Sequence, residues 1–199
     1  ARACRDAGLI FIGPDANVIE TMGGKTAARR AAINAGVPVV PGTESLPETL
    51  SEDDLRARAD EVGYPLFIKA VAGGGGRGMR RVADVDGVVA GIEAARSEAG
   101  TAFGESAVYF ERVVEGARHV EVQVLGDAHG TVVPFVEREC SIQRRHQKVI
   151  EESPSVAVTP DVRAALAESA VALSSAVNYV NAGTLEFLLD ADGHFFFLE

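Results

Sequence analysis

The sequence has few cysteines and no long apolar run. Its two cysteines, Cys4 and Cys140, form neither a disulfide framework nor a metal-binding pattern, which favours a reducing compartment. No apolar stretch approaches the roughly 20 residues that span a bilayer, and we expect no signal peptide. These absences predict a soluble, intracellular protein.

The sequence is also short of positive charge. It has 19 Lys and Arg residues against 29 Asp and Glu residues, which gives a formal net charge of −10 at pH 7. This balance argues against general nucleic-acid binding, so an anionic ligand has to be held by local cations. With 199 residues, of which 47% are hydrophobic, the chain can form one substantial core or two smaller subdomains.

Glycine, in contrast, is concentrated in residues 73–78, which read Gly-Gly-Gly-Gly-Arg-Gly. Residues 65–71 and 79–82 on either side have strand-like patterns, so the glycines are expected at the tip of a β-hairpin with Lys69 just behind it. Glycine accepts positive φ, and the N–H groups of such a loop can face one anion. We interpret the hairpin as a flap over a nucleoside triphosphate, with a flexible linker as the alternative.

Two familiar glycine motifs do not fit. Gly73, Gly75 and Gly78 match G-x-G-x-x-G, but strand-like residues follow them where a dinucleotide fold needs a helix. Residues 22–26 resemble the end of a Walker A loop, but the first glycine of that motif would fall at Ile19. Neither motif therefore explains the glycine loop.

The remaining pattern mixes helices with strands. Helices are expected at 15–22, 25–35, 51–62, 84–99 and 159–177, and strands at 9–12, 107–113, 119–125, 131–140, 184–189 and 194–199. In one of these strands, His119, Glu121 and Gln123 alternate with valines and share a face. Antiparallel-type strands combined with helices predict an α+β fold rather than a doubly wound sheet.

A basic stretch covers residues 137–148 and shows neither a helix period nor a strand period. Its cations are Arg138, Arg144, Arg145, His146 and Lys148. A solvated basic loop and an RNA-contacting patch are the alternatives, but aromatic residues for base stacking are absent here. Cations beside a phosphate flap fit a site for an anionic substrate better.

Together these stretches resemble the biotin carboxylase domain of biotin-dependent carboxylases, which belongs to the ATP-grasp superfamily. The resemblance rests on residues 73–79 and 139–148, with further matches at 11–14, 22–25, 119–123 and 183–187. It covers essentially the whole chain and implies an ATP-grasp architecture that is truncated at both ends. We expect residues 1–41 to end a preceding domain, 42–113 to form a mobile lid subdomain, and 114–199 to form an incomplete ATP-grasp core.

The resemblance implies a reaction as well. Mg-ATP (or Mn-ATP) would phosphorylate bicarbonate to carboxyphosphate, and biotin on a biotin carboxyl carrier would then be carboxylated. A carboxyltransferase would be a further partner, in an oligomeric protein of the cytoplasm or the mitochondrial matrix, without nucleic acid or membrane. The final acyl-CoA or keto-acid acceptor stays open. The alternatives are another ATP-grasp ligase, of the carbamoyl phosphate synthetase type, and a non-catalytic nucleotide-binding module.

Site residues follow from the same resemblance. Lys148, facing bicarbonate, and His146 would be catalytic, and Glu186 and Glu199 would bind the metal ion. The ATP contacts would be Lys25, Lys69, Gly73, Gly74, Gly75, Gly76, Gly78, Glu111, Val114, His119, Gln143 and His146. In the family pattern, residues after Glu199 supply an Asn ligand, an Arg and a Glu base. The isolated 199 residues are therefore expected to bind Mg-ATP weakly at best and to be inactive.

Some of these roles can be weighed from the residues alone. Lys69 lies in an apolar strand, where a lysine is costly unless it has a partner. Lys25 could be an ordinary surface lysine, and His119 could lie on a solvated sheet face. A register that places Glu186 opposite Phe197 would put Glu199 diagonally from Glu186 on the same face, within reach of a shared metal ion. A solvated hairpin without metal is the alternative.

Overall fold

The structure is a computed structural model and describes residues 1–72, 78–145 and 147–199. These residues divide into two compact units. The larger contains Ala1–Val39, Gly116–Arg144 and Lys148–Glu199, and the smaller contains Val40–Glu115 and Arg145–Gln147. Each unit combines helices with an antiparallel sheet and has its own apolar core. The expected mixed α+β composition is confirmed.

The smaller unit contains a three-stranded sheet with the order β2-β1-β3. Its strands are β1 (Leu66–Ala70), β2 (Met79–Val82) and β3 (Val108–Arg112). β1 and β2 are antiparallel, with Lys69 opposite Met79, so the expected hairpin is confirmed. The glycines expected at its tip, Gly73, Gly74, Gly75 and Gly76, lie outside the described residues.

Two helices cover this sheet with their apolar side chains. They are α4 (Glu52–Val62) and α5 (Val88–Phe103), and the short 3-10 helix η1 (Val85–Gly87) precedes α5. Ser51 caps α4, since its side chain accepts a hydrogen bond from the N–H of Asp54, as the sequence predicts. The apolar stripes of both helices pack against the inward side chains of the strands, including Ile68 and Phe110.

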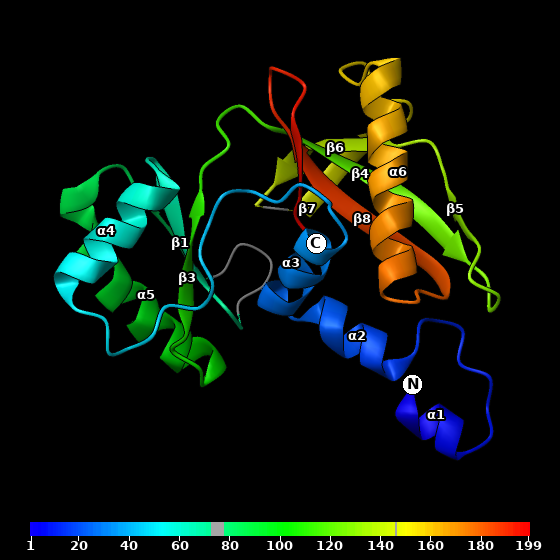
Figure 1. Cartoon of the computed structure of the whole chain (residues 1–199), viewed down its shortest axis with the longest axis horizontal. Coiled ribbons are helices and arrows are strands. Elements are labelled where there is room, and N and C mark those ends of the chain that lie inside the picture. Colours follow the sequence, from blue (N-terminus) through cyan, green and yellow to red (C-terminus); the bar gives the residue numbers. More distant parts are fainter. Residues whose placement is uncertain (73–77, 146) are drawn as a thin grey trace. The chain divides into compact units, whose positions relative to one another are not determined.

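The larger unit contains a six-stranded sheet in the order β7-β6-β4-β8-β9, with β5 also paired to β4. Its strands are β4 (Arg118–Gly126), β5 (Val132–Pro134), β6 (Arg138–Arg144), β7 (Gln147–Glu152), β8 (Asn181–Leu189) and β9 (Phe195–Phe197). Its helices are α1 (Arg2–Asp6), α2 (Ala16–Gly23), α3 (Lys25–Asn34) and α6 (Pro160–Ala176). Figure 1 shows α6, in gold, crossing the strands β4 and β8, against which its apolar side chains pack.

The two faces of β4 have opposite characters. Val120, Val122 and Val124 are buried together with Leu166 and Leu173 of α6, so they form the apolar face of the sheet. Thr159 caps α6 by accepting a hydrogen bond from the N–H of Val162, as expected from the sequence. The intervening residues of β4 consequently point to the other face, away from this core.

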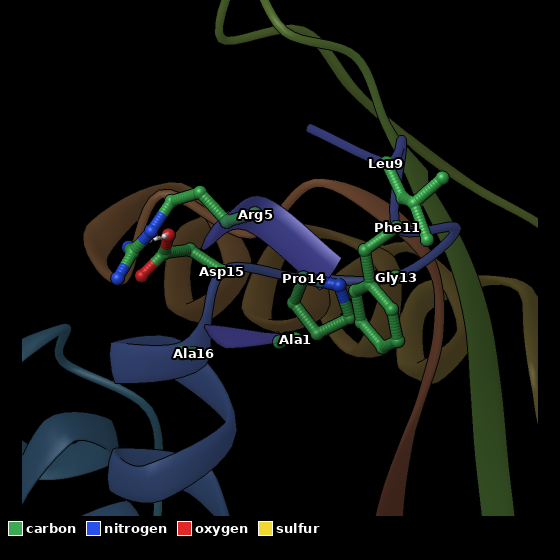
Figure 2. Close-up of a pocket in the computed structure, with 8 residues that line it drawn as sticks. All are labelled: Ala1, Arg5, Leu9, Phe11, Gly13, Pro14, Asp15 and Ala16. Carbon is green, nitrogen blue, oxygen red and sulfur yellow. Dashed lines mark ion pairs between the residues drawn. The ribbon is translucent and has the colours of Figure 1, made fainter. Parts of the chain in front are cut away.

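The prediction of a buried strand at residues 9–12 is wrong. Leu9, Ile10 and Ile12 are 64%, 95% and 83% exposed, and no strand among the described residues pairs with them. An apolar run cannot persist as a strand without a neighbour for its backbone hydrogen bonds. Leu9 and Phe11 instead border a hollow of about 310 Å³ that Arg5 and Asp15 also line (Figure 2).

Two further local predictions are wrong. The basic stretch is not irregular, because most of it forms β6 and β7; polar side chains pointing to a polar face had hidden its strand period. In the final hairpin Phe197 lies opposite Phe187 rather than Glu186. The loop closes between Asp190 and His194, where the N–H of Asp190 donates to the main-chain oxygen of His194 at 2.9 Å and the Asp190 carboxylate accepts from the N–H of His194 at 2.8 Å. This register differs by one residue from the expected one.

Candidate active site

Charged side chains from four adjacent strands gather on the polar face of the six-stranded sheet. Glu121 of β4 lies directly opposite Glu186 of β8 on one side and Arg138 of β6 on the other. Lys148 reaches the same cluster from β7. Directly opposed carboxylates repel each other, so this arrangement requires nearby cations.

Lys148 and Arg138 provide those cations. The Nζ atom of Lys148 donates to Glu121 and, at 2.6 Å, to Oε1 of Glu186. The Nε atom of Arg138 donates to Oε1 of Glu121 at 2.6 Å. Glu121 is only 2% exposed, so its charge is held almost entirely by these two partners.

These contacts shift the pKa values of the cluster. Burial alone would raise the pKa of the Glu186 carboxyl, but contacts with His119 and Lys148 outweigh burial and lower that pKa to about 2. The pKa of the Glu121 carboxyl is likewise lowered against the effect of burial, by hydrogen bonds from Lys148 and Arg138. Burial would lower the pKa of the Lys148 ammonium, but its two carboxylate partners raise it above the usual range. All three groups are therefore charged near neutral pH.

His119 and Gln143 complete the cluster. Nε2 of His119 lies 2.7 Å from Oε2 of Glu186, although the ring N–H does not point straight at this oxygen. Nδ1 of the same ring lies 2.7 Å from Nε2 of Gln143. The structure thus brings together four of the predicted site residues: His119, Gln143, Lys148 and Glu186.

A second ion pair lies in the smaller unit. Lys69 of β1 is 8% exposed and donates to Oε1 of Glu111, its diagonal neighbour on β3. The partner that a lysine in an apolar strand requires is therefore Glu111. Val114 follows β3 by two residues. Gly78 has a φ of +71°, and a Cβ there would lie 2.9 Å from Cβ of Ala70, so this position favours glycine.

The structure places the other predicted residues as follows. Lys25 is the first residue of α3. Glu199 is exposed, follows β9, and accepts a hydrogen bond through its main-chain oxygen from the N–H of Glu186 at 2.7 Å. Since the expected register is wrong, the geometric argument for Glu199 as a metal ligand no longer holds, and its assignment rests on the family resemblance. His146, like Gly73 to Gly76, lies outside the described residues.

Sequence reasoning missed Glu121 and Arg138 as site residues. A usable signal existed for Glu121, because it shares the polar face of β4 with His119. Arg138 stood in the basic stretch, but the sequence did not reveal that it pairs with Glu121.

The donor set of the cluster suits a hard cation such as Mg2+ in one respect. One potential ligand atom each of His119, Glu121 and Glu186 lies within 4.8 Å of the others, but only the two carboxylates offer the oxygen ligands that Mg2+ prefers. Each carboxylate oxygen has two lone pairs, so Glu186 can keep its protein contacts and still bind a metal ion. Lys148 already compensates both carboxylates, so a metal ion would need further oxygen ligands, such as nucleotide phosphates.

Comparison with known proteins places this arrangement in a family. Residues 24–199 match the family model of the carbamoyl-phosphate synthase L chain, ATP binding domain. The chain belongs to this family. This ATP-binding domain is 50% identical over 196 residues to biotin carboxylase 1, chloroplastic, of Populus trichocarpa. The aligned residues make up 98% of this chain and 37% of that relative.

Two solved structures are also similar to this ATP-binding domain. A biotin carboxylase of Campylobacter jejuni in complex with β,γ-ATP matches with a TM-score of 0.92 at 42% identity, over 100% of this chain and 44% of that one. The biotin carboxylase domain dimer of Hydrogenobacter thermophilus 2-oxoglutarate carboxylase, with MgADP, ADP and bicarbonate, matches with a TM-score of 0.91 at 41% identity, over 100% and 44%. The resemblance to the biotin carboxylase domain, an ATP-grasp domain, is confirmed.

The chain spans well under half the length of these relatives, 37% of the poplar protein and 44% of each solved chain. In the described part of this ATP-binding domain, no helix has the length and apolar character needed to cross a membrane.

Proposed function

We propose that the chain supplies the nucleotide and bicarbonate site of a biotin carboxylase. The reaction would use ATP to activate bicarbonate as carboxyphosphate and then transfer the carboxyl group to biotin. The observation that carries the proposal is the Lys148 ammonium held between Glu121 and Glu186. An ammonium has three N–H groups, and two of them face these carboxylates, so the third can donate to a small anion such as bicarbonate.

Most of the predicted site residues bind bicarbonate, nucleotide or metal ion in this proposal. Lys148 binds bicarbonate and offsets its charge as it approaches a phosphate. His119 and Gln143 face the nucleotide and Lys25 contacts its phosphates. The catalytic role of His146, which lies outside the described residues, rests on the family resemblance alone. A Mg2+ or Mn2+ ion, when bound by Glu186 and Glu199, would offset the charge of the nucleotide phosphates.

The smaller unit supplies the remaining nucleotide contacts in this proposal. Lys69 contacts phosphate, and Glu111 and the main chain of Val114 hold the adenine amine. Residues 42–113 act as the lid, and the glycines from Gly73 to Gly78 approach the phosphates. The lid and the role of its loop rest on the sequence.

The proposal extends to the surroundings of the chain. A biotin carboxyl carrier and a carboxyltransferase are the expected partners, in an oligomer located in the cytoplasm or an organelle matrix. The acceptor of the carboxyl group is an acyl-CoA or a keto acid. The alternatives are a carbamoyl phosphate synthetase-type ligase and a nucleotide-binding module without turnover.

An ATP hydrolysis assay on the protein that contains this chain tests the proposal. We expect phosphate release that requires bicarbonate and increases with free biotin. Lys148→Met should abolish this release while Mg-ATP still binds. Arg58→Met, which changes an exposed cation of α4, is the matched control and should leave turnover unchanged.

The outcomes separate the candidate functions. If bicarbonate-dependent phosphate release is unchanged by biotin but increases with ammonia, the carbamoyl phosphate synthetase type is favoured. Nucleotide binding without phosphate release would favour a regulatory module. Normal turnover of the Lys148→Met variant would remove this ammonium from the site.

A further inference from the structure

The side-chain amide of Gln143 makes two contacts through the same nitrogen. Its Nε2 atom lies 2.8 Å from the main-chain oxygen of Cys140 and 2.7 Å from Nδ1 of His119. A carbonyl oxygen can only accept a hydrogen bond, so the amide atom that contacts Cys140 must be the NH2 group. This fixes the orientation of the amide by chemistry, independently of how nitrogen and oxygen are assigned.

The orientation of this amide determines the protonation of the neighbouring ring. The NH2 group of Gln143 only donates, so Nδ1 of His119 must accept and therefore carries no proton. The proton of the neutral ring is then on Nε2, which lies 2.7 Å from Oε2 of Glu186. A proton on Nδ1 would instead set two donors against each other at 2.7 Å.

We propose that Gln143 is a positioning residue that fixes His119 in its Nε2–H tautomer and so places the ring proton on the nitrogen that lies nearest to Glu186. The main chain of His119 is also held by β6, because its N–H donates to Oγ of Ser141 at 3.0 Å. Gln143 and Ser141 both belong to β6, so one strand sets both the position and the tautomer of the histidine.

The tautomer determines how Glu186 is held. Oε1 of Glu186 accepts from Lys148, and Oε2 lies 2.7 Å from the protonated Nε2 of His119, although the ring N–H is not aligned for a hydrogen bond. Carboxylates that bind metal ions are commonly oriented by such outer partners. The role of Glu186 as a metal ligand rests on the proposed function, whereas the tautomer of His119 does not.

Nitrogen-15 NMR of the histidine rings at neutral pH tests the inference on the 199-residue chain. The signals of His119 are identified among the four histidines by their loss in His119→Asn. We expect an unprotonated Nδ1 and a protonated Nε2. In Gln143→Glu the new carboxylate accepts from Nδ1, so a proton should appear there. Gln147→Glu, the same change at an exposed residue of β7, should leave the His119 signals as in the wild type.

Several results would overturn the inference. One is a protonated Nδ1 in the wild type, and another is an unchanged His119 spectrum in a folded Gln143→Glu variant. If that variant does not fold, Gln143→Leu replaces it and should give a mixture of both tautomers; a pure Nε2–H spectrum there would also contradict the inference. A separate Mg-ATP titration distinguishes failure of the proposed function, because the tautomer requires no nucleotide.

Discussion

Glu121 and Glu186 lie directly opposite each other on the antiparallel strands β4 and β8. Two carboxylates in this relationship would normally destabilise a sheet. Lys148 donates to both of them, and Arg138 neutralises Glu121 from the other side. The two negative charges of the carboxylates are balanced by the two positive charges. Each cation therefore stabilises the fold, in addition to any contact that it makes with a ligand.

Replacement of Lys148 by methionine should therefore lower stability. The variant leaves Glu121 and Glu186 opposed, with Arg138 beside Glu121 and the His119 ring beside Glu186, which should cost about 2 kcal/mol of unfolding free energy. Urea unfolding at pH 7 measures this loss. The double variant Lys148→Met/Glu121→Gln removes the repulsion and should regain about half of it. A single variant as stable as the wild type would show that solvent screens this pair.

The stability of the chain should depend on the charge of Glu186. Its folded pKa is about 2, below the ordinary value of 4.5, so the folded state binds this proton less readily than the unfolded state. The stabilisation is then fully present above pH 4.5 and is lost as the pH falls to about 2. It should amount to about 2–3 kcal/mol at pH 7.

Urea unfolding at a series of pH values checks this dependence. Glu186→Gln should be less stable than the wild type at pH 7 and should approach it as the pH falls toward 3. Glu168→Gln, an exposed position on α6, is the control and should follow the wild-type curve. Parallel curves for Glu186→Gln and the wild type would contradict a lowered pKa.

The site residues were predicted from the resemblance to the biotin carboxylase domain, and the residue types add limited support of their own. The chain has only three lysines, Lys25, Lys69 and Lys148, and an acidic protein with few cations offers few sites for an anion. The period-two pattern of β4 also indicated which side chains share a face with His119. Both signals are local in the sequence, so no tertiary information was needed.

The failures of sequence reasoning involve partners that are distant in the sequence. Nothing near Glu121 indicates that it meets Lys148, 27 residues further on. The register of the final hairpin places Asp190 opposite His194, and the main-chain and carboxylate contacts between them could not be read from the sequence. A strand whose polar side chains face an ionic cluster, as in β6, has no apolar alternation to detect.

Gly183 should tolerate no side chain. A Cβ at this position of β8 would lie 2.5 Å from ring atoms of Tyr179, so Gly183→Ala should cost about 1–3 kcal/mol by overpacking. Gly100 of α5 is the matched control, since a Cβ there meets nothing within 4 Å. Gly100→Ala should gain about 0.5–1 kcal/mol from helix propensity. Opposite shifts in melting temperature are expected, and equal shifts would contradict the packing argument.

Substitutions in the Lys69–Glu111 pair should distinguish a structural role of the pair from a role in nucleotide binding. Lys69→Met leaves the buried carboxylate of Glu111 unpaired, which should cost about 3 kcal/mol. The double variant Lys69→Met/Glu111→Gln removes both charges and should regain most of that stability.

If the pair also contacts nucleotide, as proposed, Mg-ATP affinity should fall at least tenfold in both variants. The double variant regains stability, but it still lacks the Lys69 ammonium. Urea unfolding and calorimetric titration with Mg-ATP measure the two effects separately, in the protein that contains this chain. A double variant that binds Mg-ATP as tightly as the wild type would remove Lys69 and Glu111 from the nucleotide site and leave them a purely structural ion pair.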